Sequence, residues 1–365
     1  MTPERAEAQR TFLAAAGWGS ASVTPLPGDA STRHYARLAM GGRRAMLMDQ
    51  PQDAEAPVAP PDADAETRRR MGYNAVARLA GADVGRFAAA AGWLRAQGLA
   101  APEIYAADMR NGFLVLEDLG DALFADVMAV GGDEAELYRA AVDVLAKLHQ
   151  AGTPAEIGDG KPLFRYDETA LLAETDLLTE WFLPLALGRT VTAAEARQHR
   201  ALWQAALRPV LDAPPVFVHR DYHAQNLLWL PQRTGLARVG LIDFQDAVAG
   251  SRAYDLVSLL EDARRDVAPE MAAVMTAHYL ARVGIADPAA FRREMAVIAA
   301  QRNAKIAGIF ARLYARDGKA RYLALLPRVW RYLERDLSDP ALAGLRAWYD
   351  RVIPREKRSN PGETP

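Results

Sequence analysis

Two short apolar runs inside an otherwise helical part of the sequence constrain the fold more than any other feature. The runs 216–218 and 239–242 have the length of buried strands, whereas the residues on either side of them show helical periodicity. Polar side chains follow both runs, since Asp221 and Asn226 come after the first and Asp243 comes directly after the second. We therefore predict that short strands hold these polar residues on loops within a mainly helical region.

Asp221, Asn226 and Asp243 supply the polar groups that phosphoryl transfer requires. A carboxylate must orient or deprotonate the acceptor hydroxyl, and oxygen ligands must hold Mg²⁺ against the phosphates, where negative charge develops. Mg²⁺ is usually bound by one or two carboxylates together with phosphate oxygens. A lone His-x-Asp is most often an ordinary polar loop, but here three elements occur in order, each beside a short apolar run. The pattern therefore favours a kinase.

The first third of the sequence is predicted to be rich in strands. Short apolar runs separated by turn signals such as Gly41-Gly42 and Asn111-Gly112 predict five strands. One helix precedes the strands and another lies among them. The expected strands are 23–26, 34–38, 45–48, 104–107 and 113–116, and the expected helices are 5–17 and 85–97.

Beyond residue 118 the apolar periodicity becomes helical. We therefore predict an α+β fold with two lobes, in which residues 1–118 form an antiparallel five-stranded sheet plus a helix. Residues 119–365 are expected to form a larger, mainly helical lobe. Its expected helices are 135–150, 170–188, 193–211, 253–265, 268–283, 288–315 and 319–336.

Composition excludes several classes of function. The chain has 44 basic and 46 acidic residues, which gives a formal net charge of −2 and no basic excess of the kind that nucleic-acid binding requires. Cysteine is absent, so disulfides and thiolate chemistry are excluded. We expect no signal peptide and no membrane span, because no apolar run approaches the roughly 20 residues needed to cross a bilayer. A cytoplasmic protein without nucleic-acid or membrane partners is predicted, and no oligomeric state is.

The polar motifs resemble those of known kinases. The segment 219–226 reads His-Arg-Asp, four further residues and then Asn, which resembles the catalytic loop of the protein-kinase-like fold. Asp243 and Asp246 form an Asp-x-x-Asp that is similar to the aminoglycoside phosphotransferase superfamily. The resemblance implies that Asp221 is the catalytic base, that Asn226 and Asp243 bind Mg²⁺, and that ATP is the phosphoryl donor. It also implies that the N-terminal lobe binds the nucleotide and ends in a hinge.

The same resemblance points to two nucleotide-binding segments. The loop 28–33 lies between two predicted strands, where its backbone N–H groups and the hydroxyls of Ser31 and Thr32 could contact phosphate oxygens. The hinge is expected after the fifth strand, where the adenine edge would meet the Glu117 carbonyl and the Leu119 N–H. Taken alone, a glycine between two strands such as Gly28 is more often an ordinary turn, and the segment after the fifth strand is also compatible with a strand that ends at an acidic turn.

The predicted third strand lacks the lysine that kinases of this fold place on the nucleotide phosphates. The strand reads Arg-Ala-Met-Leu-Met-Asp from residue 44, and the first lysine of the chain is Lys147. We hypothesise that Arg33, at the end of the glycine loop, partly replaces the lysine, with Arg37 and Arg44 as alternatives. A solvated arginine on an edge strand explains Arg33 equally well.

A series of further blocks narrows the resemblance. In order along residues 25–315, they resemble the bacterial anomeric sugar kinases that phosphorylate N-acetylmuramate and N-acetylglucosamine at C1 in peptidoglycan recycling. Such an acceptor needs planar polar groups, and Arg302, Asn303 and Lys305 are the candidates, with Arg302 or Lys305 suited to a muramate carboxylate. The blocks are 28–38, 48–51, 112–120, 219–230, 240–247, 253–260 and 301–312.

Other readings of the same residues stay open. Another metabolite or aminoglycoside kinase of the superfamily is an alternative, and a nucleotide-binding pseudokinase is a third. Asp246 is expected to reach the metal or to be structural, and Asp255 to cap its helix and brace the catalytic loop. His223 is expected to pack or to hydrogen-bond within the loop, although it could touch the substrate.

Overall fold

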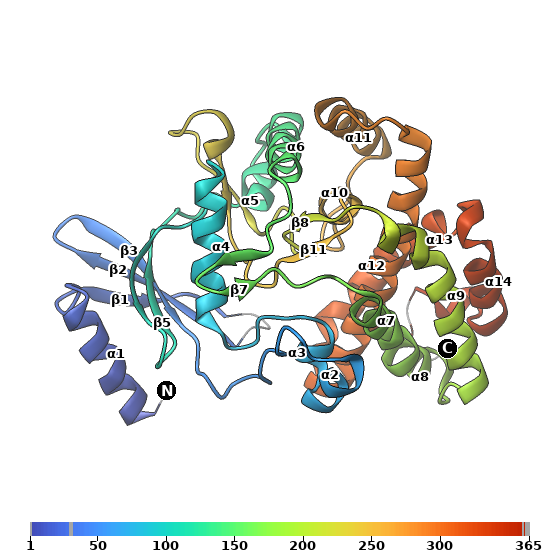
Figure 1. Cartoon of the computed structure of the whole chain (residues 1–365), viewed down its shortest axis with the longest axis horizontal. Coiled ribbons are helices and arrows are strands. Elements are labelled where there is room, and N and C mark those ends of the chain that lie inside the picture. The colour runs from blue at the N-terminus through green and yellow to red at the C-terminus, as the bar shows by residue number, and fades with distance from the viewer. Residues whose placement is uncertain (1, 29–31, 360, 362–365) are drawn as a thin grey trace. The chain divides into compact units, whose positions relative to one another are not determined.

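The computed structural model describes residues 2–28, 32–359 and 361, which form two compact units (Figure 1). The predicted lobe boundary at residue 118 coincides with neither unit's limits, and it stays a prediction. Each unit is assembled from separate stretches of the chain. The first unit comprises residues 1–144, 154–164 and 224–248, and the second comprises 145–153, 165–223 and 249–365.

A five-stranded antiparallel sheet lies in the first unit, as predicted. Its strands occur in the order β1-β2-β3-β5-β4. Gly41 and Gly42 join β2 to β3 with positive φ angles of 54° and 80°, which is the backbone of a tight hairpin turn. The strands are β1 (Ser22–Pro25), β2 (His34–Met40), β3 (Arg43–Asp49), β4 (Ile104–Asp108) and β5 (Phe113–Leu116).

Helix α1 (Pro3–Ala15) packs on one face of this sheet. The ring of Phe12 lies 5.7 Å from that of Phe113 in a stacked arrangement. Alternate strand residues such as Leu38 and Leu47 are buried in the same cluster, as the two-residue period of a strand requires. Burial of each such side chain stabilises the unit by about 1.5–3 kcal/mol.

The first unit also contains an antiparallel hairpin of β9 (Leu227–Trp229) and β10 (Val239–Leu241). Asn226 directly precedes β9, and Asp243 lies two residues after β10. Helix α4 (Val84–Ala96) packs against the segment that follows β10, because the Phe87 and Phe244 rings stack 4.8 Å apart. Asp83 caps α4 by accepting a hydrogen bond from the Gly85 N–H, and Lys161 pairs with the Asp83 carboxylate at 2.7 Å.

The second unit is built around the long helix α12 (Pro288–Asp317), which contacts α7, α10 and α13. Residues 297–304 of α12 are all buried, so this stretch lies inside the unit. Gly308 allows α7 to approach, since a Cβ there would lie 2.4 Å from the Leu177 carbonyl carbon. The neighbours are α7 (Glu168–Leu177), α10 (Ala253–Leu260) and α13 (Leu326–Asp336).

Several predicted helices differ in their limits. The predicted helix 170–188 contains a π-helical turn over 178–182, and the predicted helix 319–336 begins with a 3-10 turn. The predicted helix 253–265 ends at Leu260, because Asp262 accepts a hydrogen bond from the Arg264 N–H and so competes with the helical pattern. Unpredicted elements are α2 (Ala65–Met71), α3 (Tyr73–Val76), α5 (Phe124–Ala129), α14 (Ala343–Val352), β6 (Glu156–Gly158), β7 (Lys161–Pro162), β9 and β11 (Val248–Gly250).

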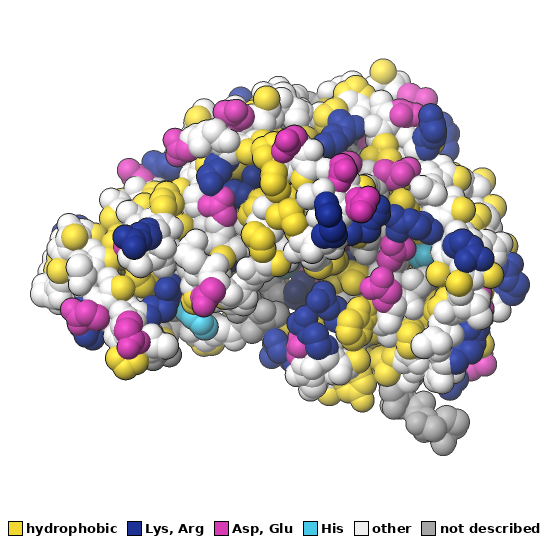
Figure 2. Space-filling model, turned by 60° about the horizontal axis from the view of Figure 1, so that its bottom comes forward, with side chains coloured by type: hydrophobic (Ala, Val, Ile, Leu, Met, Phe, Trp, Pro, Cys, Tyr) yellow, Lys and Arg dark blue, Asp and Glu magenta, His cyan; other side chains and the backbone are white. Residues whose placement is uncertain are grey.

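The remaining elements follow the predicted pattern. Strand β8 (Val216–Val218) pairs with β11 directly before residues 219–226, which we call the catalytic segment. On the face shown in Figure 2, basic and acidic side chains lie among one another. Among the described residues, no helix is both long enough and apolar enough to cross a membrane. The other helices are α6 (Glu134–Gln150), α8 (Leu183–Leu187), α9 (Ala193–Asp212) and α11 (Pro269–Val283).

Candidate active site

The catalytic segment begins where β8 ends, and Asp255 of α10 holds its first residues. The Asp255 carboxylate accepts hydrogen bonds from the backbone N–H groups of His219 and Arg220, at 2.7 and 2.9 Å. Asp255 and His219 are fully buried. Burial raises the pKa of Asp255 to about 7, although the two N–H groups favour its charged form. The expected bracing role of Asp255 is therefore visible in these contacts.

Arg220 has a strained backbone next to the predicted base Asp221. Its φ of 80° lies in the left-handed region, which costs a residue other than glycine about 1–2 kcal/mol. Its guanidinium offsets this strain, because Nη2 donates to Glu174 Oε1 at 2.6 Å and the group lies 4.6 Å from the centre of the Tyr166 ring. The chain leading into Asp221 is thus anchored through both its backbone and a side chain.

Glu174 accepts hydrogen bonds from four donors inside the second unit, and no pattern in the sequence points to it. Its Oε1 also accepts from Lys305 Nζ at 2.9 Å, and its Oε2 accepts from Gln301 Nε2 at 3.1 Å and from the Tyr166 hydroxyl. Burial alone would raise the pKa of Glu174. The charges of Lys305 and Arg220 outweigh burial and lower that pKa to about 2. Glu174 is therefore an ionised carboxylate at the base of the catalytic segment.

The predicted metal ligands lie together in the first unit. Asn226 precedes β9 and Asp243 follows β10, and the hairpin brings Asn226 Nδ2 to 3.3 Å from Asp243 Oδ2. The Ile242 N–H donates to the Asn226 carbonyl at 3.3 Å, which fixes the two segments against each other. Asp243 has a positive φ of 65° and a side chain that is 41% exposed. The hairpin thus presents a carboxylate and an amide side by side.

This donor set fits Mg²⁺ in its usual nucleotide-bound form. Carboxylate and amide oxygens are hard ligands, and the assignment of the amide oxygen and nitrogen of Asn226 can be exchanged by a flip. Within the described part of the chain, no group of three or more His, Cys, Asp and Glu residues could hold a metal ion. An ion bound by Asn226 and Asp243 would therefore need phosphate oxygens as further ligands.

Arg33 lies beside the same carboxylate. Its Nη1 donates to Asp243 Oδ1 at 3.2 Å, and its side chain is only 12% exposed. Burial lowers the pKa of Arg33, but the Tyr35 side chain and the carboxylates of Asp243 and Asp246 raise it on balance, so the cation persists. The alternative Arg37 is bound by Asp118 and Asp121, and the alternative Arg44 is exposed. Of the three candidates, Arg33 is the one that contacts a predicted metal ligand, and its phosphate-binding role stays a prediction.

The other predicted nucleotide residues have ordinary internal contacts. Ser31 lies outside the described residues, and Thr32 donates to Glu55 Oε1 at 2.5 Å. Glu117 pairs with Arg233, and Leu119 packs on an apolar cluster of Ala100, Leu228 and Leu230. The expected adenine contacts use backbone groups, so these side-chain contacts do not test them.

Asp246 accepts a hydrogen bond from the Ala80 N–H, which is a structural role.

The three predicted acceptor-binding residues are side chains of α12 with internal partners. Arg302 Nη2 donates to Ser258 Oγ at 2.8 Å, and Lys305 pairs with Glu174. Asn303 Nδ2 donates to Glu261 Oε2 at 2.8 Å and to Asp336 Oδ2 at 3.0 Å. These contacts account for their polarity within the unit, and their part in acceptor binding stays a prediction.

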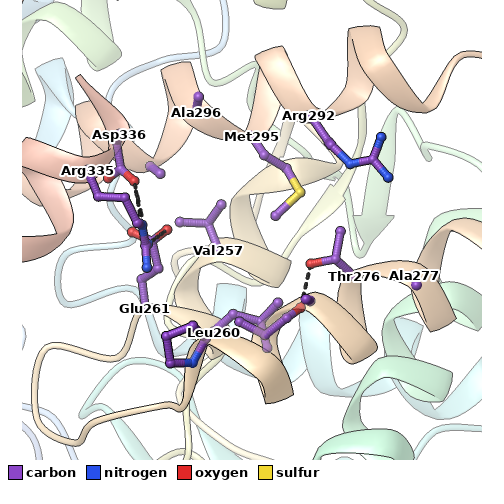
Figure 3. A pocket seen from close by; sticks show the side chains of 14 residues that line it. Val257, Leu260, Glu261, Thr276, Ala277, Arg292, Met295, Ala296, Arg335 and Asp336 are labelled. Carbon is purple, nitrogen blue, oxygen red and sulfur yellow. Dashed lines mark hydrogen bonds and ion pairs between the residues drawn. The ribbon is translucent and has the colours of Figure 1, made fainter. Parts of the chain in front are cut away.

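A pocket of about 420 Å³ lies beside the same polar cluster (Figure 3). Its walls are largely apolar, with Val257, Leu260 and Met295 among them, and the Arg335–Glu261–Asp336 group lies at one end. Burial and the neighbouring Glu261 raise the pKa of Asp336 well above its usual range. None of the described residues that line this pocket comes from the catalytic segment.

The chain after α10 contacts the catalytic segment, which the sequence analysis missed. Arg264 Nη1 lies 3.5 Å from His223 Nε2, and the His223 N–H donates to the Asp221 carbonyl at 3.1 Å. Arg264 is exposed, whereas Asp262 is 1% exposed. Asp262 Oδ1 accepts from the Arg264 N–H at 2.8 Å, and Asp262 Oδ2 has no hydrogen-bond partner among the described residues.

The chain is similar to known phosphotransferases and sugar kinases. A profile described as the phosphotransferase enzyme family matches residues 22–294. An N-acetylmuramate/N-acetylglucosamine kinase of Caulobacter vibrioides is 47% identical over 362 residues, covering 98% of this chain and 99% of that protein. A protein of the same name from Pseudomonas aeruginosa is 33% identical over 344 residues, covering 92% of this chain and 90% of that protein.

Solved structures of other phosphotransferases and kinases have a fold similar to that of this chain. An ADP-bound aminoglycoside phosphotransferase, APH(2'')-Ib, matches with a TM-score of 0.54 and 13% identity, covering 92% of this chain and 97% of that one. A microcompartment-associated aminopropanol kinase matches with a TM-score of 0.56 and 16% identity, covering 91% and 98%. These similarities confirm the predicted α+β, protein-kinase-like fold class.

Proposed function

This chain belongs to the phosphotransferase enzyme family, and we propose that it transfers the γ-phosphoryl group of ATP to the anomeric (C1) hydroxyl of N-acetylmuramate and N-acetylglucosamine. The observation that carries this proposal is the 47% identity, over nearly the whole of both chains, to a kinase named for these two sugars. The contacts around the catalytic segment support it, because they hold the residue before Asp221 in a strained and fully anchored conformation.

In the proposed reaction, Asp221 acts on the acceptor hydroxyl. The sugar oxygen bonds to the γ-phosphorus, the bond from that phosphorus to the bridging oxygen breaks, and the hydroxyl proton passes to the Asp221 carboxylate. Asn226 and Asp243 would hold Mg²⁺, which neutralises phosphate charge when it is bound. Arg33 adds a fixed positive charge beside Asp243, in place of the missing lysine.

The test is a sugar-dependent assay of ATP consumption with the full-length protein. We expect turnover with both N-acetylmuramate and N-acetylglucosamine, a phosphate on C1 in the NMR spectrum of the product, and a loss of at least about 100-fold in kcat for Asp221→Asn, as for a general base. Aminoglycosides serve as the second set of acceptors. Turnover of aminoglycosides without turnover of either amino sugar would overturn the proposed acceptor.

A further inference from the structure

We propose that Arg264 binds the carboxylate that distinguishes N-acetylmuramate from N-acetylglucosamine, and so sets the preference between the two sugars. The inference rests on the proposed function and names the contact that separates its two acceptors. N-acetylmuramate is N-acetylglucosamine with a lactyl ether on O3, so it carries one carboxylate, whereas N-acetylglucosamine is neutral. Recognition of that carboxylate is the most direct way to favour the first sugar over the second, because no other part of either sugar is charged.

The position of Arg264 places a cation against the catalytic segment. Its Nη1 lies 3.5 Å from His223 Nε2, and His223 is two residues beyond the proposed base. The His223 ring is nearly buried, at 5% exposure, while the Arg264 side chain is exposed. A guanidinium fixed on this ring is therefore reachable by an acceptor whose hydroxyl meets Asp221.

The guanidinium of Arg264 is available for a carboxylate. Within the described part of the chain, Arg264 forms no ion pair with an Asp or Glu side chain, and the His223 ring is the one polar group within hydrogen-bond distance of its guanidinium. An arginine fork offers five N–H donors in the geometry of a two-point carboxylate contact, and most of them remain for a ligand here. A bound carboxylate could thus be held without breaking an existing ion pair.

The cations that the sequence suggested for this carboxylate are already engaged. Arg302 is 5% exposed and donates to Ser258, and Lys305 neutralises the buried Glu174. Using Lys305 for the substrate would draw it from a fully buried carboxylate, which carries a high energetic cost. Arg264 carries no such cost, because its guanidinium is exposed and unpaired with acid within the described residues.

Asp262 gives a second, independent sign of a polar ligand. Its Oδ1 fixes the backbone of Arg264 through the 2.8 Å hydrogen bond from the Arg264 N–H. Its Oδ2 is buried and has no partner among the described residues, although buried polar atoms are nearly always hydrogen-bonded. A sugar hydroxyl or acetamido N–H can donate to that oxygen. The turn therefore combines a cation for the carboxylate with an acceptor for the sugar.

The experiment measures each enzyme variant with acceptors that do or do not carry a negative charge. Steady-state kinetics at saturating ATP would compare the wild type, Arg264→Ala and Arg264→Lys on N-acetylmuramate, its methyl ester and N-acetylglucosamine. We expect Arg264→Ala to lower the ratio of kcat/KM for N-acetylmuramate to that for N-acetylglucosamine by about 10- to 100-fold, the value of a charged hydrogen-bonded contact. Arg264→Lys should recover part of the ratio, since it keeps the charge without the fork.

The methyl ester keeps the test valid if a variant folds poorly. The wild type should discriminate against the ester relative to the free acid, and Arg264→Ala should treat the two alike, because the contact is missing in both. Arg351→Ala is the matched control, since Arg351 is an exposed arginine on α14 that donates to Gln198. It should leave the ratio unchanged.

Two outcomes overturn the inference. One is an equal effect of Arg264→Ala on both sugars, and the other is discrimination against the ester that persists in Arg264→Ala. Wild-type protein that phosphorylates neither sugar would instead overturn the proposed function, so the two failures are distinguishable.

Discussion

The predicted site residues fall into two groups, one in each unit, and charges in very different surroundings hold them. We call the group around Asp221 the base half and the group around Asp243 the metal half. In the second unit, Glu174 and Asp255 are fully buried and Arg220 is 2% exposed, and together they fix the chain that leads into Asp221. In the first unit, Asp243 is 41% exposed and contacts Asn226 and Arg33 at 3.3 and 3.2 Å. Breaking a buried pair costs several kcal/mol, whereas an exposed pair contributes little.

This difference in burial decides which contacts can change during the reaction without loss of stability. The base half depends on contacts that stabilise the fold, so its geometry cannot change without a large loss of stability. The metal half has long, partly exposed contacts that can be exchanged for phosphate and metal contacts at little cost. We therefore expect mutations in the base half to affect folding and activity together, and mutations in the metal half to affect activity alone.

The largest effect should follow Glu174→Ala. Arg220 and Lys305 would lose their carboxylate inside the second unit, and leaving buried charge unpaired costs about 3–5 kcal/mol. We expect the free energy of unfolding in urea to fall by that amount and kcat to fall as well, because the Arg220 backbone loses its anchor. Glu174→Gln should recover part of the loss, since it keeps the acceptor for Tyr166.

Asp266→Ala is the matched control for Glu174→Ala. Asp266 also pairs with two arginines, Arg328 and Arg331, and they also lower its pKa to about 2. Its side chain is 62% exposed, however, so solvent screens the pairs and their loss should cost less than about 1 kcal/mol. Equal losses for the two variants would show that burial does not decide the energetics of the base half.

Asp243→Asn should show the opposite behaviour in the metal half. We expect kcat/KM to fall by about 100-fold or more, because a metal contributes several kcal/mol of charge stabilisation to phosphoryl transfer. The free energy of unfolding should fall by less than in Glu174→Ala, because the Asp243 carboxylate is 41% exposed although its partner Arg33 is only 12% exposed. Titration of activity with Mg²⁺ measures the first effect and urea unfolding the second. A loss of stability as large as that of Glu174→Ala would contradict the comparison.

The sequence predicts the fold better than it predicts the support of the site. Alternating apolar residues and the Gly41-Gly42 turn identify the sheet, and spacing singles out Asp221, Asn226 and Asp243, because both signals are local. Glu174 lies 46 residues before Arg220, on a helix whose pattern does not distinguish a buried glutamate from an exposed one.

The turn after α10 could not be predicted, because a side-chain hydrogen bond there competes with the helical backbone hydrogen bonds. Asp262 ends the helix by accepting a hydrogen bond from the Arg264 N–H, so the predicted helix extends five residues beyond the observed one and covers this turn. The assembly of each unit from separate stretches of the chain could not be predicted either, because contacts between residues distant in the sequence decide it.

Asp255 allows a test of the base half by pH. Its pKa is about 7 in the folded chain because burial disfavours the charge, against 3.8 for the ordinary carboxyl. Between about pH 4 and 7 the folded state thus holds a proton that the unfolded state has released, so stability should fall as pH rises through this window. The slope is at most about 1.4 kcal/mol per pH unit.

Asp255→Asn removes this titration while keeping one acceptor oxygen for the catalytic segment. The difference in unfolding free energy between wild type and variant should therefore slope between about pH 4 and 7 and level off above it. A flat difference would mean that Asp255 is ionised throughout, held by the N–H groups of His219 and Arg220 more strongly than burial opposes it.

The smallest effect should be that of Arg33→Ala in the metal half. Removal of one cation beside Asp243 should raise the KM for ATP by about tenfold, within the range of a single charged hydrogen bond, with little change in unfolding free energy. Arg44→Ala, which removes an exposed arginine from β3, is the control and should leave the KM unchanged. A higher KM in Arg44→Ala together with an unchanged KM in Arg33→Ala would move the phosphate-binding role to β3. Both variants remove one positive charge from the first unit, so the comparison separates a direct contact from a change in net charge.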